Sequence, residues 1–156
     1  MKKFISNLLT LIVTILVSLA VLEYSVRYAI PQYDPSGHVE FVTNSDGTPT
    51  SKNRGIFRQV KNTGDYNVQV KISPLGLRES KPLNTSTSND FFVVGDSFSF
   101  GWGVEEKNRF SNILDRLLIN SQVFNISIPT DFIGYNKLIS YARKNGATIK
   151  HLIIGV

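Results

Sequence analysis

Ser97 directly follows a short apolar segment, within the tripeptide Gly95-Asp96-Ser97. The four residues before the tripeptide are Phe and Val, which predicts a buried β-strand over residues 91–94. A serine at the carboxyl end of such a strand can project its hydroxyl at the sheet edge, where backbone N–H groups can stabilise an oxyanion. These residue types suit a nucleophile for acyl transfer. By itself, the tripeptide equally fits a turn in which Asp96 or Ser97 caps a helix.

The residues that follow alternate short apolar runs with helical spacing. Apolar runs predict strands over residues 91–94, 123–128 and 151–156. Between them, apolar side chains at 110, 113, 114, 117 and 118, and again at 135, 138, 139 and 142, each fall on one face of a helix. This order predicts right-handed crossovers and a parallel sheet with helices on both faces. In such a sheet, ligands bind at the carboxyl ends of the strands, where the loop with Ser97 lies.

Three strands and two helices leave a sheet edge unpaired, and the last predicted strand has no helix after it. We therefore expect the chain to be the first part of a larger domain.

Residues 91–104 (FFVVGDSFSFGWGV) closely resemble the first motif of the SGNH hydrolases, also called GDSL-type esterases and lipases. Residues 123–129 (VFNISIP) resemble the second motif, a strand that leads into an oxyanion-hole loop. Residues 73–78 (SPLGLR) resemble a segment that often precedes the catalytic domain in membrane-anchored bacterial members. The resemblance implies an incomplete flavodoxin-like, three-layer αβα SGNH-hydrolase domain. A generic flavodoxin-like domain is the alternative.

The resemblance assigns roles to four residues. Ser97 matches the nucleophile, and its own backbone N–H would contribute to the oxyanion hole. Gly95 and Asp96 match motif residues before it, of which the aspartate is usually structural. Asn125 matches the motif asparagine of the second block.

The other oxyanion donors depart from the family pattern. The family uses the N–H of a glycine five residues after the motif asparagine, and this position is Thr130 here. Its β-branched side chain is expected to crowd the acyl oxygen, and Gly134 is a less well aligned substitute. The third donor, an asparagine just after the third strand, would fall at or beyond Gly155-Val156, where the sequence stops.

The sequence lacks the general base that the family takes from an Asp-x-x-His motif. His38 precedes the predicted domain, and His151 opens an inner strand at the end opposite the active loop, so neither is expected to act as the base. We therefore expect the chain to be inactive by itself. Two histidines and no cysteines also argue against a metal site, and no cofactor is expected.

The N-terminal sequence predicts a membrane anchor. Phe4 to Leu22 carries no charge and is long enough to cross a bilayer core. Lys2 and Lys3 precede it, so the positive-inside rule places the N-terminus in the cytoplasm and the globular part outside, periplasmic or extracellular. The alternatives are a signal peptide cleaved near Ser18 and Ala20, and a buried core helix.

We divide the chain into an anchor region (residues 1–30), an extracytoplasmic stalk with a hairpin and linker (31–90) and the catalytic part (91–156). Residues 66–72 alternate apolar and polar side chains, which predicts a strand paired with residues 55–60. Residues 81–90 are almost wholly polar and indicate a surface linker.

Two functions remain open from the sequence. The net charge of +5 is scattered, which argues against nucleic acid as a partner. The first hypothesis is a membrane-anchored serine esterase or O-acyltransferase that acts on an O-acyl ester of a cell-surface glycan. The alternative is a catalytically inactive remnant or interaction module whose incomplete sheet pairs with another chain.

Overall fold

The computed structural model describes residues 2–29, 39–61 and 64–155, so His38 and Val156 lie outside the described residues. The contacts divide the chain between residues 35 and 36 into two units. The first described unit is one helix, and the second contains all the strands.

Helix α1 (Lys2–Ala29) is long and apolar enough to span a membrane. Its candidate span has a mean hydropathy of 2.5, and none of it is buried, which a core helix would be. Hydroxyl groups within it bond back to the helix, because Thr10 Oγ1 donates to Ser6 O (3.0 Å) and Thr14 Oγ1 donates to Thr10 O (2.9 Å). The hydroxyl groups of Thr10 and Thr14 are thus satisfied within the helix itself.

The second unit contains the predicted parallel sheet, formed by β5 (Phe91–Gly95), β6 (Val123–Asn125) and β7 (His151–Gly155). The order is β6-β5-β7, with β5 in the centre, so β7 is an edge strand of the described sheet and not the inner strand expected from the sequence. Strand β6 is shorter than predicted. Ser127 N–H bonds to the side chain of Asn125 (2.9 Å), and this local turn ends the strand.

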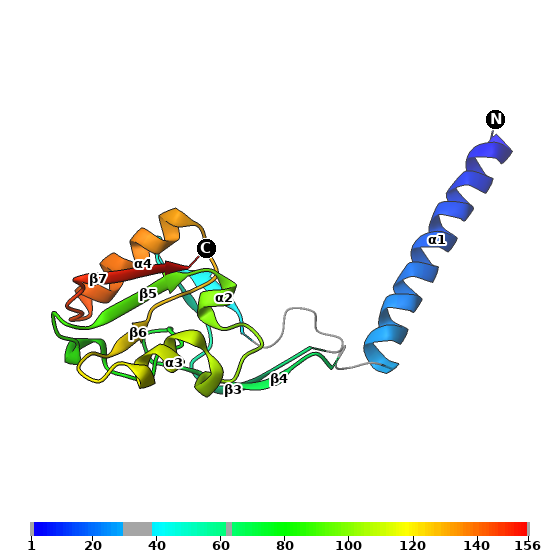
Figure 1. The fold of residues 1–156 in the computed structure, drawn as a ribbon. Coiled ribbons are helices and arrows are strands. Elements are labelled where there is room, and N and C mark those ends of the chain that lie inside the picture. Colours follow the sequence, from blue (N-terminus) through cyan, green and yellow to red (C-terminus); the bar gives the residue numbers. More distant parts are fainter. Residues whose placement is uncertain (1, 30–38, 62–63, 156) are drawn as a thin grey trace. The chain divides into compact units, whose positions relative to one another are not determined.

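Helices α3 (Phe110–Leu117) and α4 (Phe132–Lys144) connect the three strands and lie on opposite sides of the sheet (Figure 1). Helix α3 connects β5 to β6 on one side of it, and α4 connects β6 to β7 on the other side of β5. Because such crossovers are right-handed, the opposite directions of the two connections place the helices on opposite faces. Helix α4 buries the predicted face, with Leu138 and Ala142 fully enclosed.

The predicted apolar face of α3 is exposed among the described residues. Phe110 and Ile113 are each 41% accessible and Leu117 is 72% accessible, whereas Ser111 is buried against the unit. The periodicity therefore predicted the helix correctly but did not predict that its apolar face would be exposed among the described residues.

Two antiparallel hairpins precede the sheet. The predicted one consists of β3 (Gly55–Val60) and β4 (Asn67–Ile72), and alternate residues of β4 are buried as the pattern required. The other, β1 (Phe41–Thr43) with β2 (Pro49–Ser51), lies in the segment assigned to the stalk, for which the sequence predicted no strand before residue 55. Its sequence signal is the Asp46-Gly47 turn, in which Gly47 has a φ of +81°.

Residues 81–90, expected to form a surface linker, lie mostly at the surface and are fixed to the unit by a few buried residues. Leu83 and Asp90 are buried, and the carboxylate of Asp90 accepts hydrogen bonds from the N–H groups of Gln122 (2.6 Å) and Thr87 (2.6 Å). Short 3₁₀ turns at Leu83–Thr85 and Glu106–Asn108 complete the unit.

Candidate functional site

Ser97 lies in the turn between the central strand β5 and the short helix α2 (Ser97–Phe100). Asp96 caps this helix, because its Oδ1 accepts a hydrogen bond from Phe98 N–H (2.9 Å). The side chain of Ser97 is half-buried, and neither its hydroxyl nor its backbone N–H has a hydrogen-bond partner among the described residues. A hydroxyl and an adjacent N–H donor are thus both available at the carboxyl end of the sheet.

The turn is tight because Ser99 packs its side chain onto the sheet. A Cβ atom on Gly95 would overlap both Ser99 Oγ and the backbone oxygen of Gly155, and a Cβ on Gly155 would also overlap Ser99 Oγ. Ser99 itself is 2% accessible. The motif glycine is therefore required by close approach of the helix to two neighbouring strands.

Asn125 fixes the same turn from the next strand. Its Nδ2 donates to Ser99 O (2.8 Å) and to Ser111 Oγ (2.8 Å), while its Oδ1 accepts from Ser127 N–H. The residue is 1% accessible, so it has no access to a substrate. Its geometry is that of a positioning residue that links α2, α3 and the loop after β6.

Thr130 follows β6, whose carboxyl end lies at the same sheet edge as Ser97 because the strands are parallel. Its backbone N–H has no acceptor among the described residues. A Cβ atom on Gly134 would overlap the Thr130 side chain, which therefore packs against the first turn of α4. The N–H of Gly134 donates to Asp131 Oδ1 (2.8 Å), so Gly134 is not a free substitute donor.

The two loops at this edge lie close together. Burial raises the pKa of Tyr135, and the negative charges of Asp96 and Asp131 raise it further. Asp96 belongs to the turn that carries Ser97, and Asp131 caps α4 directly after Thr130. Both carboxylates therefore lie within electrostatic range of one phenol, so the β5–α2 turn and the start of α4 both lie near Tyr135 at this edge of the sheet.

A buried arginine holds the loop that follows α2. Arg78 is 1% accessible, and its guanidinium donates to Gly101 O (2.6 Å) and Val104 O (2.6 Å), with longer bonds to Phe100 O and Gln69 O. Burial, with the nearby charge of Arg109, lowers its pKa to about 10. The sequence marked Arg78 as a motif residue only, and the contacts to the nucleophile loop were not foreseen.

Gly101 sits against this arginine and a second one. It has a φ of +84°, and a Cβ there would stand 2.8 Å from Arg109 Cδ and 3.1 Å from Arg78 Nη1. Arg109 is also buried, which lowers its pKa, and it donates to the backbone oxygen of Arg78 and to Asn112 Oδ1. Two buried guanidinium groups therefore fix the path of the loop.

No described histidine reaches Ser97. His151 pairs in register with Phe91 at the start of the strands, whereas Ser97 lies beyond the Gly95–Gly155 pair. Four residues of strand separate these pairs by about 13 Å at 3.3 Å per residue. Within residues 2–29, 39–61 and 64–155, no group of three or more His, Asp or Glu side chains is arranged to hold a metal ion.

The aromatic residues after Ser97 have different surroundings. Phe100 is fully buried in the core, and Trp102 is half-buried with its Nε1 donating to Tyr66 OH (2.8 Å). Phe98, next to Ser97, is 84% accessible. Among these three aromatics, only Phe98 is free to contact an acyl group.

No protein-family model, no curated protein and no solved structure matches this chain. The functional argument therefore depends on the chemistry of the residues at the carboxyl edge of the sheet.

Proposed function

We propose that this chain is the N-terminal portion of a membrane-anchored serine ester hydrolase or O-acyltransferase of the SGNH type, with Ser97 as the nucleophile. The observation that carries the proposal is that the hydroxyl and the N–H of Ser97, at the end of the central parallel strand, have no hydrogen-bond partner in the described part of the chain. The sheet order β6-β5-β7 also supports it, because flavodoxin-like sheets begin with the second, first and third strands side by side.

In the proposed reaction, Ser97 Oγ attacks the ester carbonyl carbon and its proton passes to a base. The N–H groups of Ser97 and Thr130 stabilise the oxyanion. The C–O bond to the alcohol then breaks, the alcohol leaves with a proton, and the acyl group remains on Ser97. Water or a sugar hydroxyl takes the acyl group in the second step, and the serine recovers its proton.

The base must come from outside the described residues, because His151 lies at the far end of the sheet. Oxyanion and binding effects without a complete triad leave an acceleration of about 10³ to 10⁴ over water. Because the sequence has no Asp-x-x-His motif, we expect the chain by itself to be a very weak esterase at most.

The location of the ester follows from the anchor. With α1 in the cytoplasmic membrane and Lys2 and Lys3 inside, the unit with Ser97 lies in the periplasm or outside the cell. The proposed substrate is an O-acyl ester of a cell-surface glycan.

A first test concerns the missing base. The gene sequence downstream of the codon for Val156 should encode an Asp-x-x-His motif, preceded by an asparagine shortly after β7. A natural stop codon with no such sequence in any frame would contradict the proposal that this chain is part of a serine esterase.

A second test concerns the serine itself. The full chain in detergent, extended with the downstream sequence, should hydrolyse p-nitrophenyl acetate and carry an acetyl group on the peptide with Ser97. Ser97→Ala should abolish both signals, whereas Ser121→Ala, a serine in the loop before β6, should retain them. Equal rates for the wild type and Ser97→Ala would show that another group is responsible.

One observation favours the alternative, a non-catalytic interaction module. Strand β7 is at the sheet edge, and its Leu152 and Ile154 are exposed, as is the apolar face of α3. An edge strand with free backbone groups can pair with a strand of another chain. In that case, Ile154→Lys should prevent oligomers or complexes seen by light scattering, and no Ser97-dependent hydrolysis should appear.

A further inference from the structure

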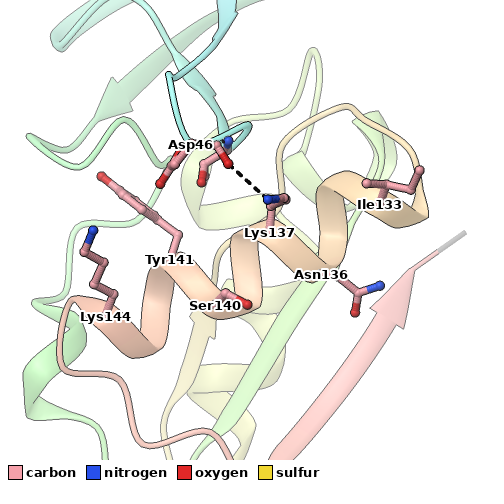
Figure 2. Close-up of a pocket in the computed structure, with 8 residues that line it drawn as sticks. Asp46, Ile133, Asn136, Lys137, Ser140, Tyr141 and Lys144 are labelled. Atoms are coloured by element: carbon pink, nitrogen blue, oxygen red, sulfur yellow. Dashed lines mark hydrogen bonds between the residues drawn. The ribbon is translucent and has the colours of Figure 1, made fainter.

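An open pocket of about 400 Å³ lies between the turn that joins β1 to β2 and the outward face of α4 (Figure 2). The turn contributes Asp46 and Thr48, and the helix contributes Lys137, Ser140, Tyr141 and Lys144. Neither Ser97 nor any residue of its turn lines it. The pocket is thus distinct from the proposed oxyanion site.

The pocket has more spare positive charge than negative charge. Lys137 Nζ makes one hydrogen bond, to the backbone oxygen of Asp46 (3.1 Å). Lys144 has no hydrogen bond or ion pair among the described residues. The Asp46 carboxylate accepts a hydrogen bond from the N–H of Thr48 (3.0 Å), which, with the nearby charge of Lys144, keeps the pKa of Asp46 below the usual value. Two ammonium groups therefore share one carboxylate at the pocket, which leaves a net positive charge and N–H donors without an acceptor among the described residues.

The remaining lining suits a molecule rich in hydroxyl groups. Ser140 Oγ has no partner among the described residues, and the ring of Tyr141 stands at the wall with its hydroxyl bonded to Leu75 O (3.1 Å). Ile133, 71% accessible, adds an apolar surface at one end. A flat ring and an aliphatic side chain beside hydroxyl and amine groups match the mixed apolar and polar faces of a sugar.

The pocket also begins near the proposed catalytic edge. Ile133 is in the first turn of α4, just after Thr130, and Lys144 is in its last turn. Lys137 and Lys144 are seven residues apart, or about 10.5 Å along the helix axis. A chain-like ligand along α4 would therefore contact both ammonium groups and leave one end beside the loop that carries Thr130.

We propose that this pocket binds an anionic saccharide, a sugar segment with carboxylate or phosphate groups, and so holds the glycan next to the ester. The statement that the bound glycan carries the ester rests on the proposed function. The binding step itself involves Lys137, Lys144 and Ser140 and requires no reaction at Ser97.

Calorimetric titration of the full chain in detergent tests this site with three probes: trigalacturonate, inorganic phosphate and the neutral maltotriose. Trigalacturonate or phosphate should bind, and the double variant K137Q/K144Q should weaken the binding about tenfold or more, because it removes two charge-assisted contacts. Whichever anion binds more tightly identifies the carboxylate or the phosphate form of the ligand. Lys150→Gln, an exposed lysine outside the pocket, serves as the matched control and should bind as the wild type does.

Three results would overturn the inference: no binding of either anion, unchanged affinity in K137Q/K144Q, or equal affinity for maltotriose. Ser97→Ala should leave the titration unchanged. Anion binding in a chain that shows no Ser97-dependent hydrolysis would therefore refute the proposed reaction and support this pocket. Ser97-dependent hydrolysis in a chain that binds no anion would refute the pocket and support the reaction.

Discussion

The hydroxyl of Ser99 lies against Gly155 so closely that a Cβ atom on Gly155 would overlap it. Ser99 belongs to the short helix that begins with Ser97, and Gly155 is the last described residue of β7. The turn with the proposed nucleophile thus rests directly on the edge strand, and a side chain at either glycine beneath it would displace the turn.

This contact predicts a selective rescue. Gly155→Ala should destabilise the unit by about 1 to 3 kcal/mol through overpacking, and Ser99→Gly should restore most of that loss, because among the described residues the new Cβ meets only the side chain of Ser99. Gly95→Ala should be equally harmful but not rescued, since its Cβ would also meet the backbone oxygen of Gly155. Urea unfolding followed by the fluorescence of Trp102, the single tryptophan, measures each free energy. Equal rescue of both glycine variants would contradict this geometry.

Arg78 should be essential for the loop after α2. Arg78→Met leaves the half-buried Val104 carbonyl without a donor and leaves the buried Gly101 carbonyl with only the Val104 N–H, so we expect a loss of about 1 to 3 kcal/mol. Arg78→Lys should recover little of it, because one ammonium group cannot replace the planar fork that reaches several carbonyls. The emission of Trp102 should shift to the red in both variants. Arg116→Met, an exposed position on α3, is the control, and a loss for Arg78→Met no larger than this control would exclude the role.

Asp90 should make stability depend on pH in the acid range. Burial favours its neutral form, but hydrogen bonds from the N–H groups of Gln122 and Thr87 outweigh burial and hold the pKa below 3.8. The folded state therefore binds the proton less tightly than the unfolded state, so the contribution is complete above about pH 4 and is lost as the pH falls through the lowered pKa.

The corresponding variant is Asp90→Asn, which should cost about 1 to 3 kcal/mol at pH 7, because an amide NH₂ would face backbone donors. The difference from the wild type should shrink below pH 4. Asp65→Asn, in an exposed ion pair with Lys61, should change stability by less than about 1 kcal/mol. A difference for Asp90→Asn that stays constant from pH 7 to pH 2 would rule out this linkage.

The orientation of α1 can be measured with a C-terminal alkaline phosphatase fusion. The fusion should be active and should stay in the membrane fraction after a carbonate wash, because the positive-inside rule predicts that lysines before the apolar run keep the N-terminus in the cytoplasm. Lys2→Glu with Lys3→Glu should lower the activity by partial inversion. A soluble exported fusion would indicate a cleaved signal peptide, and a soluble inactive fusion in the cytoplasm would remove the basis for a cell-surface substrate.

Local patterns in the sequence were sufficient for the elements themselves. The alternation in residues 66–72 predicted β4, the helical spacing from Tyr135 to Ala142 predicted the buried face of α4, and the uncharged run after Lys3 predicted α1. The turn with Ser97 was also expected, because Gly95-Asp96-Ser97 after an apolar strand fits a turn in which Asp96 caps a helix. Each of these depends on residues that are neighbours along the chain, where backbone sterics and periodic burial act.

The tertiary structure decided which of these residues meet. Gly155 looks like any strand glycine until Ser99 packs on it, and Arg78 looks like a surface charge until four carbonyls from distant segments surround it. The same apolar spacing buries α4 and leaves α3 exposed, because burial depends on what packs against a helix and not on the helix itself. Contacts between distant residues carry no local signature, and for this reason only the folded chain determines how the turn with Ser97 is held.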